Sequence, residues 1–163
     1  MKIALVRVDD RLIHGQVVLG WVRMVGATRI VVADDDVAKD EMQKTLMRFA
    51  APTGVETSIV SVEEAGAALA HDGFPDDTVM VLARGPRELA RLMAAGVPVT
   101  KVNVGNVRAA PGRERLTKEV AADPDDLAAW QALDAAGVTL EAVWIPGGAV
   151  TDFNRVVRAR VRT

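Results

Sequence analysis

Near its N-terminus the chain reads Ile3-Ala4-Leu5-Val6-Arg7-Val8-Asp9-Asp10-Arg11-Leu12-Ile13-His14-Gly15-Gln16-Val17-Val18. The first part, residues 3–8, is apolar and rich in branched side chains, which is typical of a strand buried in a parallel sheet. The last part opens a stretch, residues 15–25, whose apolar side chains recur at helical spacing. Residues 9–14 therefore form a strand-to-helix loop. Ligands bind beyond the carboxyl ends of parallel strands, so we expect a functional site at this loop.

The same alternation of apolar runs and helical patterns continues along the chain. The expected strands are residues 3–8, 29–33, 56–60, 78–83, 101–104 and 140–145. The expected helices are residues 15–25, 37–50, 62–71, 86–95, 124–136 and 152–160. This alternation predicts the α/β class: a single domain over residues 1–163, with a mostly parallel central sheet flanked by helices and joined by right-handed crossovers.

Two helix ends carry signals of their own. Asp123-Pro124 reads as an N-cap followed by proline in the first helical turn. The last helix is expected to place one apolar stripe inward and to end in a cluster of arginines, where positive charge is favourable. The stripe is Phe153, Val156, Val157 and Val161, and the cluster is Arg155, Arg158, Arg160 and Arg162.

Composition excludes several classes of function. The chain of 163 residues has 22 acidic and 20 basic residues, a balance that gives no reason to expect nucleic acid as a partner. It has no cysteine, which excludes disulfides, thiolate metal sites and a cysteine nucleophile. No apolar run approaches the ~20 residues that span a bilayer, and the start is too short and too soon acidic for a signal peptide. We therefore expect a cytoplasmic protein.

The chain has two histidines, and their settings differ. His71 falls at the end of an expected helix, where a polar side chain satisfies terminal carbonyls. His14 lies in the loop beside arginines and at the start of a helix, a setting that suits an anion and phosphate above all. A neutral imidazole is a good nucleophile towards phosphorus, so we expect His14 to carry a phosphoryl group. The alternative is a structural histidine, hydrogen-bonded to Asp9 or Asp10, that only holds the loop.

Charged neighbours of His14 fit the same chemistry. Arg11, three residues earlier, can present its planar fork to phosphoryl oxygens, and Arg7 at the strand end is a further candidate for this role. Asp9 or Asp10 can orient the arginine or accept a hydrogen bond from the imidazole, and of the two we favour Asp10. An N-cap of the following helix is the competing explanation for these carboxylates.

Other polar stretches are weaker candidates. The segment around Asn103, Gly105 and Asn106 follows a later strand and either brings backbone N–H groups to the same crevice or forms a plain turn. The run Asp34–Asp36 is expected to cap the next helix rather than to bind a metal. No P-loop and no complete Gly-x-Gly-x-x-Gly is present, so we expect no cofactor.

The stretch Arg7-x-Asp9-Asp10-Arg11-Leu12-Ile13-His14-Gly15-Gln16-Val17 closely resembles the signature of a known family. This family is the IIB component of the mannose/fructose/sorbose class of the bacterial phosphoenolpyruvate-dependent sugar phosphotransferase system. The resemblance continues over essentially the whole chain, through residues 32–38, 44–46, 51–55, 96–98 and 102–105. The chain departs from the family at Asn106, residues 113–115 and residues 147–149, which puts sugar preference and partner docking in doubt.

The resemblance implies a phosphotransferase in which His14 accepts a phosphoryl group from a IIA phosphohistidine and Arg11 pairs with that group. The group then passes to a sugar as the sugar moves through the membrane-embedded IIC and IID components. The chain would then associate with the inner face of the membrane through IIC and IID. Such relays need small, transient interfaces. Leu12, Ile13 and Val17 are candidates for that surface, with burial in the core as the alternative.

Two other functions use the same loop. A regulatory phosphoprotein would report sugar status through phosphorylated His14 without delivering phosphate to a permease. A binding module would use the arginines to hold an anionic metabolite. The sequence leaves open the sugar, the phosphorylated ring nitrogen, whether IIA is a separate chain, and whether the protein forms a homo-oligomer.

Overall fold

The computed structural model, which describes residues 1–160, has a seven-stranded sheet in the order β3-β2-β4-β1-β5-β8-β9. Its strands are β1 (Lys2–Val8), β2 (Arg29–Ala33), β3 (Glu56–Val60), β4 (Thr78–Ala83), β5 (Lys101–Val104), β8 (Thr139–Ala142) and β9 (Thr151–Asp152). All neighbouring strands are parallel except β9, which runs antiparallel to β8. The predicted α/β class with a mostly parallel sheet is confirmed.

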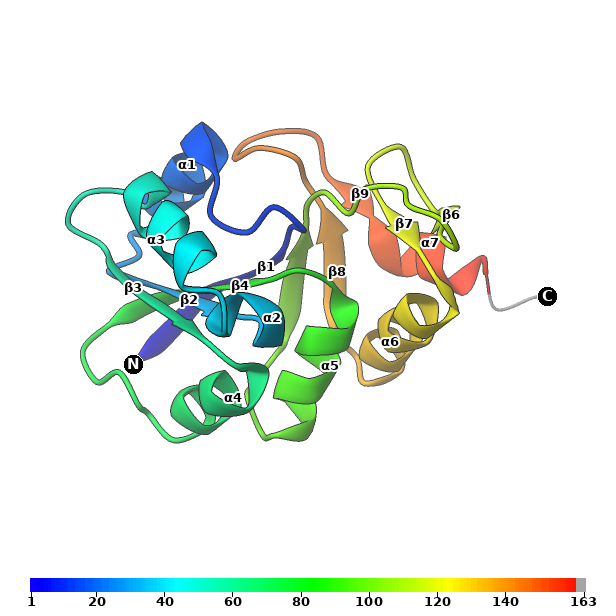
Figure 1. The fold of residues 1–163 in the computed structure, drawn as a ribbon. Helices are drawn as coiled ribbons and strands as arrows, with labels where there is room; N and C mark the ends of the chain where they lie inside the picture. The colour runs from blue at the N-terminus through cyan, green and yellow to red at the C-terminus, as the bar shows by residue number, and fades with distance from the viewer. Residues whose placement is uncertain (161–163) are drawn as a thin grey trace.

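Helices cover both faces of the sheet (Figure 1). One face carries α1 (Gly15–Val25), α2 (Asp35–Ala38) and α3 (Glu41–Ala50). The other carries α4 (Val62–Ala70), α5 (Pro86–Ala94), α6 (Pro124–Ala135) and α7 (Phe153–Arg158). The apolar core is accordingly divided in two. Along β2, for example, Ile30 and Val32 pack with the α1 side, whereas Val31 and Ala33 pack with the α4 side. Continuous apolar strands of this kind are buried on both faces.

The chain changes direction across the sheet between β1 and β5. After β1 it crosses by α1 to β2, whereas after β5 it crosses by α6 to β8 on the opposite face. The crossovers that leave these two neighbouring strands therefore lie on opposite faces of the sheet, which makes the carboxyl ends of β1 and β5 a topological switch point. In open α/β sheets this is the place where ligands bind.

The prediction of one continuous helix over residues 37–50 is wrong. It is divided into α2 and α3 at Lys39 and Asp40. Asp34 caps the first of these helices by accepting hydrogen bonds from Asp36 N and Val37 N, and Asp40 caps the second from Met42 N and Gln43 N. Two N-capping carboxylates so close in the chain favour two short helices over one long helix.

Two further segments differ from the prediction, and a third prediction extends beyond the described residues. The strand expected over residues 140–145 is β8, which ends at Ala142, and the chain then leaves the sheet. The loop after Val104 contains a small antiparallel pair, β6 (Glu114–Arg115) and β7 (Ala121–Ala122). Val161 and Arg162, which the sequence places on the last helix, lie outside the described residues.

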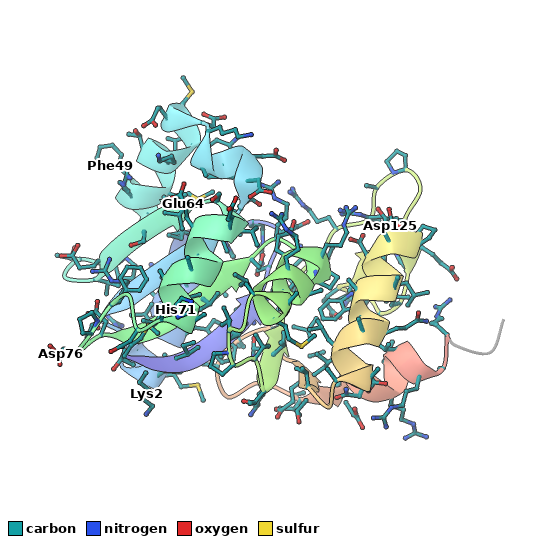
Figure 2. The ribbon with its side chains drawn as sticks, turned by 90° about the horizontal axis from the view of Figure 1, so that it is seen from below. Lys2, Phe49, Glu64, His71, Asp76 and Asp125 are labelled. Atoms are coloured by element: carbon teal, nitrogen blue, oxygen red, sulfur yellow. The ribbon has the colours of Figure 1, made fainter. Side chains whose placement is uncertain are left out.

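Two predicted helix ends are confirmed. Asp123 caps α6 in a capping box with Asp126, and Pro124 occupies the first turn. His71 is the C-cap of α4, where Figure 2 labels it. Over residues 1–160 no helix combines the length and the apolar character needed to cross a bilayer.

Candidate active site

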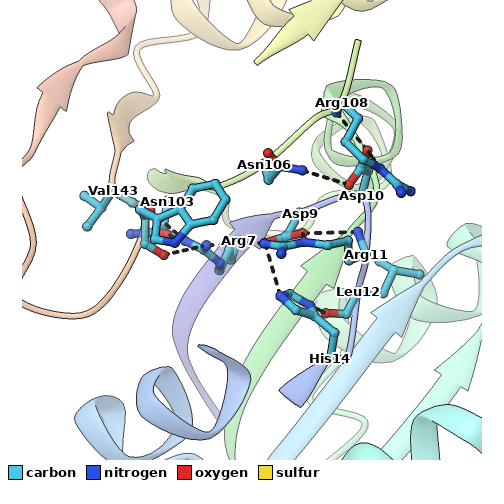
Figure 3. Close-up of polar contacts among 11 residues, drawn as sticks. Arg7, Asp9, Asp10, Arg11, Leu12, His14, Asn103, Asn106, Arg108 and Val143 are labelled. Atoms are coloured by element: carbon cyan, nitrogen blue, oxygen red, sulfur yellow. Dashed lines mark hydrogen bonds and ion pairs between the residues drawn. The ribbon is translucent and has the colours of Figure 1, made fainter. Parts of the chain in front are cut away.

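The candidate site lies at the carboxyl ends of β1 and β5, where two loops are tied together. Gly105 N donates to Val8 O at 2.7 Å, and Asp10 N donates to Asn106 O at 2.8 Å. Residues 9–14, which follow β1, are here called the 9–14 loop. It lies against the segment after β5, to which Asp10 is hydrogen-bonded (Figure 3).

Arg7, near the end of β1, lies beneath this loop and is fully buried. One terminal amino group donates to Asn103 Oδ1 and, at 2.9 Å, to Val143 O. The other donates to Trp144 O at 3.1 Å and to Asp9 Oδ2 at 3.4 Å. Burial lowers the pKa of the guanidinium, against the opposing effect of the Asp9 carboxylate. Both terminal amino groups of Arg7 are therefore engaged by the protein itself.

Asp9 is the centre of the polar network and is completely buried. Its Oδ1 accepts from the backbone N and the Nε of Arg11, both at 3.1 Å. Its Oδ2 accepts from an amino group of Arg11 at 3.2 Å and from Arg7, and lies 3.9 Å from His14 Nε2. One carboxylate thus holds two guanidiniums and faces the imidazole (Figure 3).

Asp10, which we favoured as the orienting carboxylate, faces the other way. Its Oδ1 accepts from Asn106 Nδ2 at 3.3 Å, and its Oδ2 accepts from the backbone N and the Nε of Arg108 at 2.8 and 3.1 Å. It fastens the 9–14 loop to the segment after β5. Asp9, not Asp10, contacts the arginine and faces the imidazole of the site.

His14 is itself the N-cap residue of α1, and no side chain caps the first turn of this helix. Its side chain is 23 % exposed, so the ring is not sealed in the interior. Nδ1 donates to Leu12 O at 2.8 Å. The loop reaches this geometry through two left-handed residues, Leu12 with φ 58° and Gly15 with φ 48°. Such backbone strain in a non-glycine residue is concentrated at functional sites.

The apolar candidates for a docking surface are placed differently from the expectation. Leu12 and Ile13 are buried in the core beside α1, and Val17 is half-buried against the same cluster. The exposed apolar side chains here are instead Trp144, which lies against Arg11, and the following residue Ile145, both in the loop after β8.

Sequence reasoning missed two tryptophans of the site. The Arg11 guanidinium stacks 5.1 Å from the centre of the Trp144 ring, and Arg7 stacks 5.0 Å from that of Trp21. No local pattern marks these partners. Asn103 carries one usable signal, since it is the polar residue among the three buried residues of β5, and such a side chain needs a partner.

The acidic run 34–36 serves structure. Asp34 caps α2 and pairs with Arg84 at 2.9 Å, while Asp35 accepts from Val62 N and from Arg91. The Val62 amide and the Arg91 guanidinium hold the pKa of the Asp35 carboxyl below its usual value. In the part of the chain that the structure describes, no group of three acidic or histidine side chains is arranged to hold a metal ion.

Comparison with known proteins points to one family. Residues 3–162 match the family model described as PTS system sorbose subfamily IIB component. The chain is 40 % identical over 158 residues to the PTS system fructose-specific EIIB component of Bacillus subtilis (strain 168), covering 97 % of each chain. It is 38 % identical over 141 residues to the PTS system mannose-specific EIIAB component of Escherichia coli (strain K12), covering 86 % of this chain and 44 % of that protein.

A solved structure agrees with these sequence matches. The crystal structure of the IIBSor domain of the sorbose permease from Klebsiella pneumoniae superposes with a TM-score of 0.93 at 36 % identity, covering 100 % of both chains.

Proposed function

Because the chain belongs to the sorbose-subfamily IIB components of the phosphotransferase system, we propose that His14 is the residue that carries the phosphoryl group. As a IIB component the chain is a phosphotransferase of sugar uptake. One observation carries the assignment of the residue. A partly exposed imidazole lies at the uncapped N-terminus of α1, beside an arginine whose fork is locked by a buried carboxylate. Oxyanions bind at such helix ends.

The donor is a IIA phosphohistidine. One relative is an EIIAB component, so IIA and IIB occur in the same chain there. The lone pair of one His14 nitrogen forms a P–N bond while the donor's P–N bond breaks and its electron pair stays on the donor ring. One P–N bond replaces another, and the two rings together keep their number of protons. A transfer between two such similar groups is close to isoenergetic.

The acceptor is a sugar hydroxyl. The P–N bond at His14 breaks, a P–O bond to the sugar forms, and the hydroxyl proton ends on the imidazole nitrogen that the phosphoryl group leaves. Transfer of this kind requires positioning and stabilisation of charge rather than further covalent chemistry. The free N–H groups of the first turn of α1 and the remaining amino group of Arg11 supply that stabilisation.

The imidazole must turn before it accepts the group. In the present conformation Nδ1 is bonded to the Leu12 carbonyl and Nε2 faces Asp9. A phosphoryl group needs one of these nitrogens free and directed to solvent. Asp9 and Arg7 then act as positioning residues: Asp9 holds the Arg11 fork, and Arg7 holds Asp9 from below.

Delivery takes place at the membrane. We propose that the phosphorylated chain docks on the membrane-embedded IIC and IID components at the inner face of the membrane and transfers the group to the sugar that they carry. The exposed Trp144 and Ile145 beside Arg11 are suited to such a transient contact.

The test is a phosphotransfer assay. Wild type is incubated with phosphoenolpyruvate, the general phosphotransferase proteins and a matching IIA, and acid-labile phosphate is measured. We expect one phosphate per chain in wild type and none in His14→Ala. Addition of membranes that contain IIC and IID, with each candidate sugar, should then discharge the label. Retention of label by His14→Ala contradicts the assignment, and label that no sugar discharges points to a regulatory phosphoprotein instead.

A further inference from the structure

Three ion pairs beside the 9–14 loop share an arrangement that the proposed mechanism does not use. In each pair the carboxylate is inside and the arginine is outside. The pairs are Asp10–Arg108, Asp34–Arg84 and Asp126–Arg113. The three carboxylate side chains are between 4 and 8 % exposed, whereas the three arginine side chains are between 24 and 69 % exposed. Each pair therefore presents its cationic end to solvent.

These three arginines, Arg84, Arg108 and Arg113, are here called the guanidinium face. Together with Asp10 they line a surface hollow of about 310 Å³. Both oxygens of Asp10 are already engaged, by Asn106 and by Arg108. An anion that enters the hollow thus meets the N–H donors of the arginines, and the negative charge of Asp10 is paired with Arg108.

Arg84 and Arg108 are each fixed by a hydrogen bond at Nε, whereas their terminal amino groups are free among the described residues. Arg84 donates through Nε to Asp34 at 2.9 Å, and Arg108 donates through Nε to Asp10 at 3.1 Å. Within residues 1–160, the terminal amino groups of these two arginines have no hydrogen-bond partner. A guanidinium fixed along one edge and open at its end binds a carboxylate or phosphate with little further loss of side-chain freedom.

The carboxylates behind the face are fixed by the backbone. Asp34 caps α2, Asp126 belongs to the capping box of α6, and Asp10 accepts from the backbone N of Arg108. These bonds set where each arginine points. The face is therefore a pre-organised set of donors and not a group of mobile cations.

The position of the face identifies its partner. Asp10 lies between Asp9 and Arg11 in the chain and lines the hollow, so the hollow lies beside the 9–14 loop that carries His14. The protein that delivers a phosphoryl group to His14 must cover this edge, and it carries a negatively charged phosphohistidine. The hollow is concave, and its cationic lining residues are arginines rather than lysines. Guanidinium forks bind individual carboxylates in a directed way, so the hollow suits the carboxylates of a protein better than a flat anionic lipid surface.

We propose that the guanidinium face docks an acidic surface of the IIA phosphoryl donor, with carboxylates of IIA bound by Arg84 and Arg108 while its phosphohistidine faces His14. The proposal rests on the function proposed above. Asp125, an exposed carboxylate in the first turn of α6 (Figure 2), is not among the residues that line the hollow. Steering by such a face raises the rate of encounter and weakens with salt.

The experiment compares wild type with the double variant Arg84→Gln/Arg108→Gln. Initial rates of transfer from phosphorylated IIA to His14 are measured over a range of IIA concentrations, at low and at raised ionic strength. At low salt we expect the KM for phosphorylated IIA to rise about tenfold in the double variant, with kcat within about twofold of wild type. The dependence of kcat/KM on salt should become shallower. Arg84→Lys/Arg108→Lys keeps the charge and should recover that salt dependence.

Arg158→Gln is the matched control, because Arg158 of α7 is about as exposed as Arg108 and is ion-paired with Asp134 of α6, but does not line the hollow. It should behave as wild type. Thermal unfolding of every variant reports on the fold. If the folded double variant keeps the wild-type KM and salt dependence, the docking proposal is overturned while His14 phosphorylation stands. Loss of binding only to phosphatidylglycerol vesicles, with transfer from IIA unchanged, overturns it as well. Absence of label on wild-type His14 overturns the proposed function itself.

Discussion

Gly105 lies directly against the guanidinium of Arg7. A Cβ atom at position 105 would lie 2.7 Å from Arg7 Cζ and 2.8 Å from Val8 O, closer than packed atoms tolerate. The absence of a side chain at 105 is thus what allows the buried arginine to reach Asn103 and Asp9 beneath the site.

Gly105→Ala should therefore displace the buried Arg7 side chain that supports Asp9. The added methyl displaces Arg7 or the strand end, which costs about 1–3 kcal/mol of unfolding free energy in urea. It should also slow phosphorylation of His14 by about tenfold or more, because Asp9 loses its support. Gly85→Ala is the control, since a Cβ there meets only an ordinary contact at 3.5 Å. Wild-type transfer by Gly105→Ala would contradict the role given to Arg7.

Replacement by asparagine should slow phosphoryl transfer much more at Asp9 than at Asp10. Asp9→Asn places an amide between two guanidiniums and removes the carboxylate that neutralises them in a buried setting, at a cost of about 3 kcal/mol. Transfer to His14 should fall at least tenfold. Asp10→Asn removes only a tie to Asn106 and Arg108, so its transfer rate should stay within about threefold at saturating donor. Rapid-quench labelling and urea unfolding measure both variants. Equal effects would contradict the assignment of Asp9 as the positioning carboxylate.

Arg11→Lys should separate charge from geometry. Lysine keeps the positive charge but cannot bind Asp9 through two nitrogens and a phosphoryl oxygen through a third. We expect the rate of transfer at saturating donor to fall about tenfold, with the unfolding free energy within about 1 kcal/mol of wild type, because Arg11 is partly exposed. A fully active Arg11→Lys variant would leave the phosphoryl contact of this arginine without support.

Trp144→Ala should loosen Arg11 without removing it. The ring stacks on the guanidinium at 5.1 Å, a contact of about 0.5–1 kcal/mol at a partly exposed position. The expected result is a severalfold lower transfer rate in Trp144→Ala, and a smaller loss in Trp144→Phe, which retains an aromatic face. If both variants transfer at the same reduced rate, the stacking contact is not the cause.

Glu88 should limit stability at neutral pH. Burial raises the pKa of its carboxyl, and repulsion from Asp34 and Asp126 adds to this effect. The folded state therefore binds this proton more tightly than the unfolded state, so the ionised group costs stability above its ordinary pKa of 4.5. Glu88→Gln should raise the urea midpoint at pH 7, and the gain should disappear as the pH falls below that value. Glu56→Gln, at an exposed position on β3, is the control. A gain that persists unchanged at pH 3 would point to a cause other than ionisation.

Local sequence determined most of the framework. The branched apolar run before Asp9, the helical spacing after His14 and the cap at Asp123-Pro124 each specify their element through neighbouring residues alone. The same neighbours placed His14, the phosphoacceptor we propose, and Arg11 on one loop. The division of residues 37–50 into two helices was missed, although its cause, the cap at Asp40, is local too.

Tertiary structure alone decided which of these residues meet. Arg7 finds Asn103 at a separation of 96 residues and the Trp144 carbonyl at 137, and the parallel sheet brings these partners together. The choice of Asp9 over Asp10, the burial of Leu12 and Ile13, and the outward-facing arginines of the guanidinium face depend on the same packing. Periodicity and capping are properties of neighbouring residues, whereas a partner across the sheet is set by strand order and by the switch point where the crossovers diverge.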